Sequence, residues 1–218
     1  MTAWPGSLGC AARFRDSAES SPQHLFDLCK TVADRLVALV ALVVALPAML
    51  LCMAVIRLSS TGPALLRQTR LGRHGRPFAM YKLRTMYMDA EAFSGPVLAA
   101  ANDARIVPSC KWMRRSHLDE LPQLLNVLKG EMSLVGPRPE RPEIAQRIYE
   151  DLPEFRYRLH VRPGITGLAQ VCNGYDTCLD AVKLKLEYDL DYIRQRCWSV
   201  ELWILTRTLI KLYDPTAR

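Results

Sequence analysis

The chain has 218 residues, a length that suits one domain with its own hydrophobic core and argues against a second catalytic domain. Its 29 Lys and Arg outnumber its 22 Asp and Glu and give a net charge of +7, which favours an anionic partner such as nucleic acid, acidic lipid or a phosphorylated substrate. The seven cysteines are odd in number and scattered without a C-x-x-C pair. This pattern argues against a disulfide framework and a structural zinc site.

The first part of the chain divides into a polar extension and an apolar segment. Residues 1–24 mix Gly, Pro, Ser and charged residues without a period, and we expect a mobile extension there. From Leu25, apolar residues recur at spacings of three and four, which predicts an amphipathic helix. The helix leads into residues 36–56, a run of 21 residues without a charge that is long enough for a transmembrane helix. The length of the run and the acids before it argue against a signal peptide.

Pro47 and the flanking cations argue against a simple membrane span. Pro47 lies near the middle of the apolar run, where the missing backbone hydrogen bond predicts a kink. Cations flank both ends, with Lys30 and Arg35 before the run and Arg57 after it. The positive-inside rule therefore draws both ends to the cytoplasmic face. A re-entrant helix-break-helix satisfies both features, but the residues by themselves leave a kinked spanning helix open.

A basic segment follows the apolar run. Residues 57–88 contain seven Lys or Arg and no Asp or Glu, which is typical of a surface that rests on anionic lipid. Within the segment, PFAMYKLRTM alternates loosely and predicts a short strand with Lys82 and Arg84 on one face. Two cations on one face of a strand could instead bind a phosphate.

Residues 118–130 carry the strongest local signal of the chain. Four leucines at spacings of three and four predict a helix, and Gly130 is placed to end it. Pro122 suits only the first turn of a helix, which puts the helix start near Asp119. Asp119 is then an N-cap and Glu120 a first-turn acid that complements the helix dipole. Alternatively, the helix terminus together with Arg114 and Arg115 keeps Asp119 ionised, so that it can bind a metal or attack phosphorus.

Two rigid turns each carry an arginine. Arg138 stands between two prolines, and this preorganisation lowers the entropy cost of holding a phosphate. Arg162 lies in a Gly/Pro turn over residues 161–167, and the following LAQV is expected to form a short strand. Residues 182–193 and 198–213 are expected to be helices, the second of which suits either the headgroup zone or the protein core. The sequence contains no P-loop, dinucleotide fingerprint or nucleic-acid motif, so nucleic acid is not an expected partner.

Four segments resemble, in order and spacing, those of the bacterial sugar transferase family, in particular its small monotopic polyprenyl-phosphate phosphoglycosyl transferases. The resemblance covers about residues 25–213. The segments are RQTRLGRHGRPFAMYKLRTM (67–86), LDELPQLLNVLKGEMSLVGPRP (118–139), VRPGITGLAQV (161–171) and EYDLDYI (187–193).

The resemblance implies an α+β, mainly helical fold with a re-entrant N-terminal membrane helix broken at Pro47. It further implies a small cytosolic domain with short strands and amphipathic interfacial helices, on the cytoplasmic face of the bacterial inner membrane. The expected division of the chain is the extension at 1–24, the re-entrant segment at 25–57, the membrane-associated catalytic domain at 58–213 and a tail at 214–218. Oligomeric state, including a homodimer, stays open.

The resemblance also implies the chemistry. Asp119, paired with Glu120, would attack the β-phosphorus of a UDP-sugar, expel UMP and hold the phosphosugar as an acyl phosphate, which undecaprenyl phosphate would then attack. Mg²⁺ is the implied cofactor, with Asp119 as its protein ligand. Such a reaction starts the membrane stage of exopolysaccharide, capsule, O-antigen or glycoconjugate assembly. The residues expected to bind phosphate or substrate are Arg114, Arg138, Lys82, Arg84 and Arg162.

The chain departs from the family pattern at two places that bear on function. Leu46 precedes the helix-breaking proline where many members have Ser, and Tyr175 stands near where some members carry a phosphate-contacting Arg. The competing interpretation is a catalytically silent basic scaffold that binds anionic lipid, with Asp119 as no more than a cap.

Overall fold

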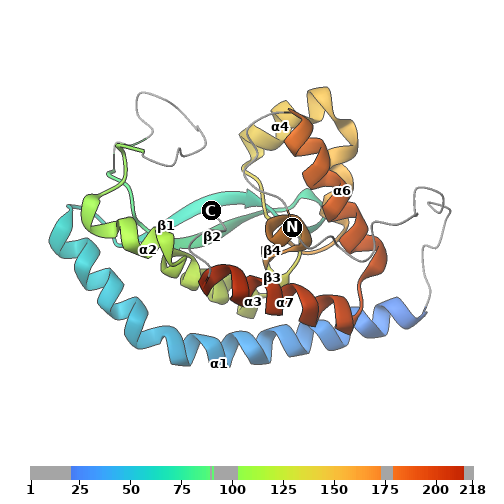
Figure 1. Cartoon of the computed structure of the whole chain (residues 1–218), viewed down its shortest axis with the longest axis horizontal. Helices are drawn as coiled ribbons and strands as arrows, with labels where there is room; N and C mark the ends of the chain where they lie inside the picture. The colour runs from blue at the N-terminus through green and yellow to red at the C-terminus, as the bar shows by residue number, and fades with distance from the viewer. Residues whose placement is uncertain (1–20, 89, 91–102, 173–178, 214–218) are drawn as a thin grey trace.

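The computed structural model describes residues 21–88, 90, 103–172 and 179–213. Most of the predicted N-terminal extension, the segment around Tyr175 and the C-terminal tail lie outside these residues. Helices dominate, and the strands are short (Figure 1). In chain order the elements are α1 (Ser21–Ser59), β1 (Leu65–Leu71), η1 (Arg73–Gly75), β2 (Pro77–Leu83), η2 (Pro108–Cys110), α2 (Lys111–Arg115), η3 (Leu118–Gln123), α3 (Leu124–Lys129), β3 (Ser133–Val135), α4 (Pro142–Asp151), η4 (Pro153–His160), β4 (Gly164–Thr166), α5 (Leu168–Cys172), α6 (Leu179–Gln195) and α7 (Trp198–Tyr213).

Helix α1 is a single helix of 39 residues with Pro47 inside it. The predicted separation into two helices by a break is therefore not seen, because the helical hydrogen bonding resumes beyond the proline. Figure 1 shows α1 as a long curved helix along one side of the molecule, and an internal proline is a usual cause of such curvature. By length and composition α1 is apolar enough to cross a membrane, with a mean hydropathy of 2.9 over its most apolar part.

One face of α1 packs against the rest of the protein and the other is exposed. Ala38, Cys52 and Ile56 are almost fully buried, whereas apolar side chains on the other face are exposed, Val44 by 75% and Leu51 by 63%. Exposed apolar surface of this extent is unfavourable in water and marks a membrane or interaction surface.

The N-terminal half of α1 is held to the domain by buried charges. Lys30 Nζ lies 2.7 Å from Glu201 Oε2 in α7 and 3.2 Å from Asp34 Oδ2. The Ser133 hydroxyl donates to Asp34 (2.6 Å), and the Tyr192 hydroxyl donates to Glu201 (2.7 Å). Each of the buried charges therefore has a partner, which is the condition under which buried ionic groups are tolerated.

The hairpin of β1 and β2 confirms the first seven residues of the strand predicted at PFAMYKLRTM; β2 ends at Leu83, so Arg84 lies just beyond it. The two strands are antiparallel, with Leu65 opposite Leu83 and Leu71 opposite Pro77. A second, two-stranded sheet pairs β3 with β4 in parallel.

The prediction of a strand at LAQV was wrong, because this segment forms α5. Leu168 and Ala169 are adjacent and both buried, whereas a strand with one exposed face would bury alternate residues. Leu and Ala also favour helix. The strand of this region is instead β4, within the preceding turn.

The two predicted C-terminal helices are confirmed as α6 and α7. In α7, Glu201 and Ile204 are buried against the core, while Leu202, Leu209 and Ile210 are more than half exposed. Helix α7 thus packs on the domain through one face and presents an apolar second face to the surroundings.

Candidate active site

Helix η3 carries the carboxylate pair, and its start differs from the prediction. His117 is the N-cap residue, in the left-handed conformation with φ of 56°, and Asp119 lies in the first turn of the 3₁₀ helix. The interpretation of Asp119 as an N-cap was therefore wrong. Pro122 lies inside η3, which continues into α3, and Gly130 ends α3 at a φ of 80° as predicted. Non-glycine residues rarely adopt positive φ, and such residues are often found at functional sites.

Cations from two distant segments converge on the carboxylate pair. Asp119 is buried, with 1% exposure. Lys82 Nζ, at the end of β2, lies 2.9 Å from Asp119 Oδ2 and 3.3 Å from Glu120 Oε1. Arg138 Nη2 lies 2.7 Å from the same Glu120 oxygen. The fold thus brings together four of the residues predicted for the site.

The two carboxylates have different environments. Burial alone would raise the pKa of Glu120, but the facing Arg138 and Lys82 outweigh it and hold that pKa well below its usual range. Asp119 Oδ2 accepts no hydrogen bond from the described residues, since the approach of Lys82 lies outside hydrogen-bond geometry. Glu120 therefore forms ion pairs with two cations, Lys82 and Arg138, whereas Asp119 has a buried oxygen that accepts no hydrogen bond from the described residues.

Arg114 is available for an anionic ligand. It lies in the last turn of α2, three residues before His117, and is half-buried. Its guanidinium forms no hydrogen bond or ion pair within the part of the chain that the structure describes.

Arg84 and Arg162 are not brought to the carboxylate pair. The guanidinium of Arg84 is buried and donates to the carbonyls of Ser60 (3.0 Å), Thr61 and Gly62 (3.3 Å). It therefore satisfies backbone acceptors just beyond the end of α1.

Arg162 donates to the hydroxyl of Thr31 in the N-terminal part of α1. The charge of Asp119 instead acts on Cys52, near the other end of that helix, where it adds to the burial that raises the pKa of this thiol. Cys52 lies 21 positions after Thr31 in α1, which corresponds to about 30 Å along the helix at 1.5 Å per residue.

Two buried amides behind the site were not identified from the sequence. Asn126 is fully buried, and its side chain hydrogen-bonds Tyr81 N (3.0 Å), Ala79 O (2.7 Å) and Glu131 Oε2 (2.7 Å). Gln123 is 2% exposed, and its amide nitrogen finds no acceptor among the described residues. The signal available was a polar residue at each of two positions, three apart, within the leucine pattern.

The residues of the site determine whether it can bind Mg²⁺. No group of three or more His, Cys, Asp or Glu side chains suited to a metal occurs within the described ranges. Mg²⁺ often takes only one or two protein carboxylates, however, and fills its other positions with water and substrate phosphate. Asp119 Oδ2 is buried and accepts no hydrogen bond from the described residues, so it is suited to be the carboxylate ligand of Mg²⁺. The residues present therefore fit the ion.

Comparisons with known proteins identify the family of the chain. Residues 25–214 match the family described as bacterial sugar transferase. A protein of Aeromonas hydrophila named UDP-N-acetylgalactosamine-undecaprenyl-phosphate N-acetylgalactosaminephosphotransferase is 37% identical over 188 residues, covering 86% of this chain and 44% of that protein. Two proteins named UDP-glucose:undecaprenyl-phosphate glucose-1-phosphate transferase are also similar. The one from Xanthomonas campestris pv. campestris is 40% identical over 86% of this chain and 38% of its own length. The one from Caulobacter vibrioides is 41% identical over 197 residues, which cover 88% of this chain and 72% of that protein.

The chain thus spans less than half the length of the first two relatives. Their names specify different sugars at nearly equal identity to this chain. Overall similarity therefore does not choose between the sugars.

Proposed function

The chain belongs to the bacterial sugar transferase family, and on that premise we propose that it transfers a phosphosugar from a UDP-sugar to undecaprenyl phosphate and releases UMP. The observation that carries the proposal is the environment of Asp119. Its carboxylate is buried, one oxygen accepts no hydrogen bond from the described residues, and a lysine Nζ lies 2.9 Å away. A buried carboxylate with a free lone pair beside a cation is suited to attack phosphorus.

The reaction proceeds in two displacements. In the first, an oxygen of Asp119 forms a bond to the β-phosphorus of the UDP-sugar, and the bond from that phosphorus to the bridging oxygen breaks, so that UMP leaves with the electron pair. The product is a phosphosugar held on Asp119 as an acyl phosphate. In the second, a phosphate oxygen of undecaprenyl phosphate attacks the same phosphorus, and the bond to Asp119 breaks. This step regenerates the carboxylate and gives the lipid-linked diphosphosugar.

The cations reduce the repulsion between the nucleophile and its anionic substrate. Lys82 and Arg138 already lie at the carboxylate pair. Arg114, in the helix that precedes η3, has no ion pair among the described residues and would be the third cation of the site. An incoming diphosphate competes with Glu120 for these cations. Glu120 therefore holds them in place before the substrate binds, and such preorganised charge is an effective source of transition-state stabilisation. Mg²⁺ held by Asp119 would, when bound, supply further neutralisation of the diphosphate.

We test this function by measuring UMP release. Purified protein in detergent is incubated with undecaprenyl phosphate, Mg²⁺ and one UDP-sugar at a time, beginning with UDP-glucose and UDP-N-acetylgalactosamine. We expect UMP with at least one sugar, none in the Asp119→Asn variant, and normal release in an Asp191→Asn control. Absence of UMP with every common UDP-sugar, or unchanged release in Asp119→Asn, refutes the enzyme and favours a silent lipid-binding scaffold.

The covalent intermediate has its own test. A two-step reaction lets labelled UMP enter the UDP-sugar pool before undecaprenyl phosphate is added, because the first displacement is reversible by itself. We expect this exchange in the wild-type protein and none in Asp119→Asn. UMP release that requires undecaprenyl phosphate, together with no exchange in its absence, would indicate direct transfer.

We also propose that α1 is re-entrant, with both ends and the site on the cytoplasmic face of the inner membrane. The proposal is supported by the exposed apolar face of α1, by Pro47 inside it and by cations at both ends. Helix α7, with its exposed apolar face, would lie at the same surface.

Cysteine labelling of intact cells distinguishes the two topologies. One variant keeps the exposed Cys29 as its sole cysteine, and a second has Ser59→Cys as its sole cysteine. A membrane-impermeant reagent should label neither until the inner membrane is permeabilised. Labelling of one end from outside would establish a spanning helix.

A further inference from the structure

The loop that carries Arg138 is fastened to the protein through its backbone carbonyls. Four consecutive carbonyls each accept a hydrogen bond from a donor outside the loop. The donor and acceptor pairs are Gly164 N to Pro137 O (3.0 Å), Arg158 Nη2 to Arg138 O (2.8 Å), Arg70 Nη1 to Pro139 O (3.1 Å) and Leu71 N to Glu140 O (2.9 Å). The two prolines have no N–H groups and the loop has no regular pairing, so its position depends on these donors.

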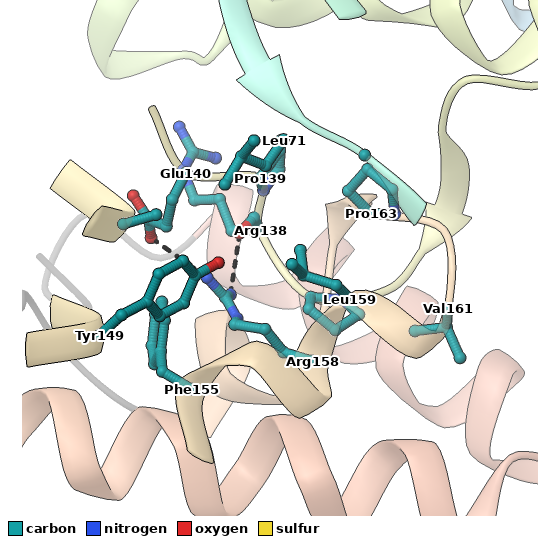
Figure 2. A pocket seen from close by; sticks show the side chains of 13 residues that line it. Leu71, Arg138, Pro139, Glu140, Tyr149, Phe155, Arg158, Leu159, Val161 and Pro163 are labelled. Carbon is teal, nitrogen blue, oxygen red and sulfur yellow. Dashed lines mark hydrogen bonds and ion pairs between the residues drawn. The ribbon is translucent and has the colours of Figure 1, made fainter. Parts of the chain in front are cut away.

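Arg158 is the donor that acts on Arg138 itself, and it is the centre of a buried charge cluster. Figure 2 shows Arg158 between Arg138 and Glu140. Its side chain is 4% exposed, and its Nε and Nη2 lie 3.0 and 2.7 Å from Asp189 Oδ2. Glu140 lies 3.5 Å from Arg158 Nη1 and 2.8 Å from Lys185 Nζ.

Opposite charges face one another in this cluster. Arg158 and Lys185 face Asp189 and Glu140, and the charge of Arg70 also acts on Glu140. Burial alone would raise the pKa of Glu140, but Lys185 and Arg158 hold it at about 2. Glu140 is therefore ionised at neutral pH, whereas burial raises the pKa of Asp189 although Arg158 and Lys185 oppose this shift. Removal of one member of the cluster leaves another buried group without its partner.

A guanidinium is required at residue 158. Its planar fork lets Nη2 donate to the carbonyl of Arg138 while Nε and Nη2 donate to Asp189. A lysine carries the same charge on a single nitrogen and cannot reproduce both directions at these distances. Lysine at 158 therefore preserves the positive charge while loosening the hold on Arg138.

We propose that Arg158 and Asp189 are positioning residues that set Arg138 against Glu120 in the active site. This inference rests on the proposed function and assigns a role to Asp189, which lies in the EYDLDYI segment and does not contact the carboxylate pair. The connection runs from Asp189 in α6 to Arg158 in η4, from there to the backbone of Arg138, and through its side chain to Glu120. Neither Arg158 nor Asp189 touches the reacting atoms.

A double-mutant comparison tests the proposal. Arg158→Lys and Asp189→Asn are each made in the wild-type protein and in an Arg138→Ala background, and UMP release is measured. In the wild-type background we expect losses of about 10- to 100-fold, the range typical of residues that orient a catalytic group. In the Arg138→Ala background the further loss should be below about twofold, because the group being positioned is absent.

Asp191→Asn is the matched control, since Asp191 lies in the same helix as Asp189 and forms an ion pair with the nearby Arg194 at 3.7 Å. It should retain wild-type activity. Equal losses in both backgrounds, or wild-type activity in both variants, would overturn the proposal. Loss of folding in both variants would show a general structural role and overturn it as well.

A second readout separates this proposal from the proposed function. Hydrogen exchange of residues 136–141 should quicken in Arg158→Lys and stay unchanged in Asp191→Asn, whether or not the protein turns over a UDP-sugar. Unchanged exchange in Arg158→Lys contradicts the positioning role. If exchange quickens as expected but the wild-type protein releases no UMP, the proposed function fails instead.

Discussion

Replacement of Asn126 tests how the active-site elements are held together. Its side-chain amide lies against the edge of β2 that does not face β1, where Oδ1 accepts from Tyr81 N and Nδ2 donates to Ala79 O. The amide thus completes that edge as a peptide group of a third strand would. Because Lys82 follows Tyr81, and η3 leads into the helix that carries Asn126, this contact joins the lysine of the site to the segment of its carboxylates.

The magnitude follows from the bonds that are lost. Asn126→Ala removes three side-chain hydrogen bonds, including one to Glu131. A net value of about 1 kcal/mol for each bond gives a loss of roughly 3 kcal/mol in the free energy of unfolding, and more where a buried group is left without a partner. For a chain of this size the expected fall in Tm is about 10 °C.

Thermal unfolding in detergent, followed by far-UV circular dichroism, measures the effect. Lys129→Ala is the control on the same helix, because Lys129 is exposed and its bond to the Tyr81 hydroxyl faces solvent. We expect it to cost less than about 1 kcal/mol. A cost for Asn126→Ala no greater than that of Lys129→Ala would refute the idea that this amide joins β2 to α3.

Two further predictions concern pH and backbone strain. Glu140 titrates near 4.5 when unfolded and, although burial opposes it, near 2 when folded, because Lys185 and Arg158 face it. Ionised Glu140 therefore contributes stability that is present above about pH 4.5 and is lost as the pH falls toward 2. The Tm of Glu140→Gln should consequently decline less between pH 5 and 3 than the Tm of the wild-type protein. A parallel decline of the two Tm values would contradict the lowered pKa. His117 has a φ of 56°, a conformation that Gly adopts easily and Val does not. The free energy of unfolding of His117→Gly should therefore exceed that of His117→Val by about 1–2 kcal/mol, which thermal unfolding measures. Equal stability of the two variants would show that the strain is relieved elsewhere.

Local signals in the sequence predicted several elements correctly. The alternation over PFAMYKL predicted β2, Gly130 predicted the end of α3, and the apolar pattern from Trp198 predicted α7. These features depend on backbone conformation and periodicity over a few residues, so they need no knowledge of distant contacts.

The errors have different physical causes. LAQV forms a helix, in agreement with the helix propensity of Leu and Ala, and its two leading side chains are both buried. His117 caps η3 in place of Asp119 although its positive φ is unfavourable. The expected break at Pro47 is a curve, because one missing hydrogen bond and a steric clash bend a helix without ending it.

The sequence by itself determined the charge-free run that is long and apolar enough to cross a membrane, the adjacent carboxylates in a leucine-patterned helix and the arginine between two prolines. These are properties of residue order. Only the tertiary structure decided which cations face those carboxylates. Lys82 and Arg138 both contact Glu120, although they lie 38 and 18 residues from it in the sequence. Arg84 lies only two residues from Lys82, yet it donates to the carbonyls beyond the end of α1. Neighbouring cations carry the same charge and similar reach, so their separate roles depend on which acceptors the fold places near each one.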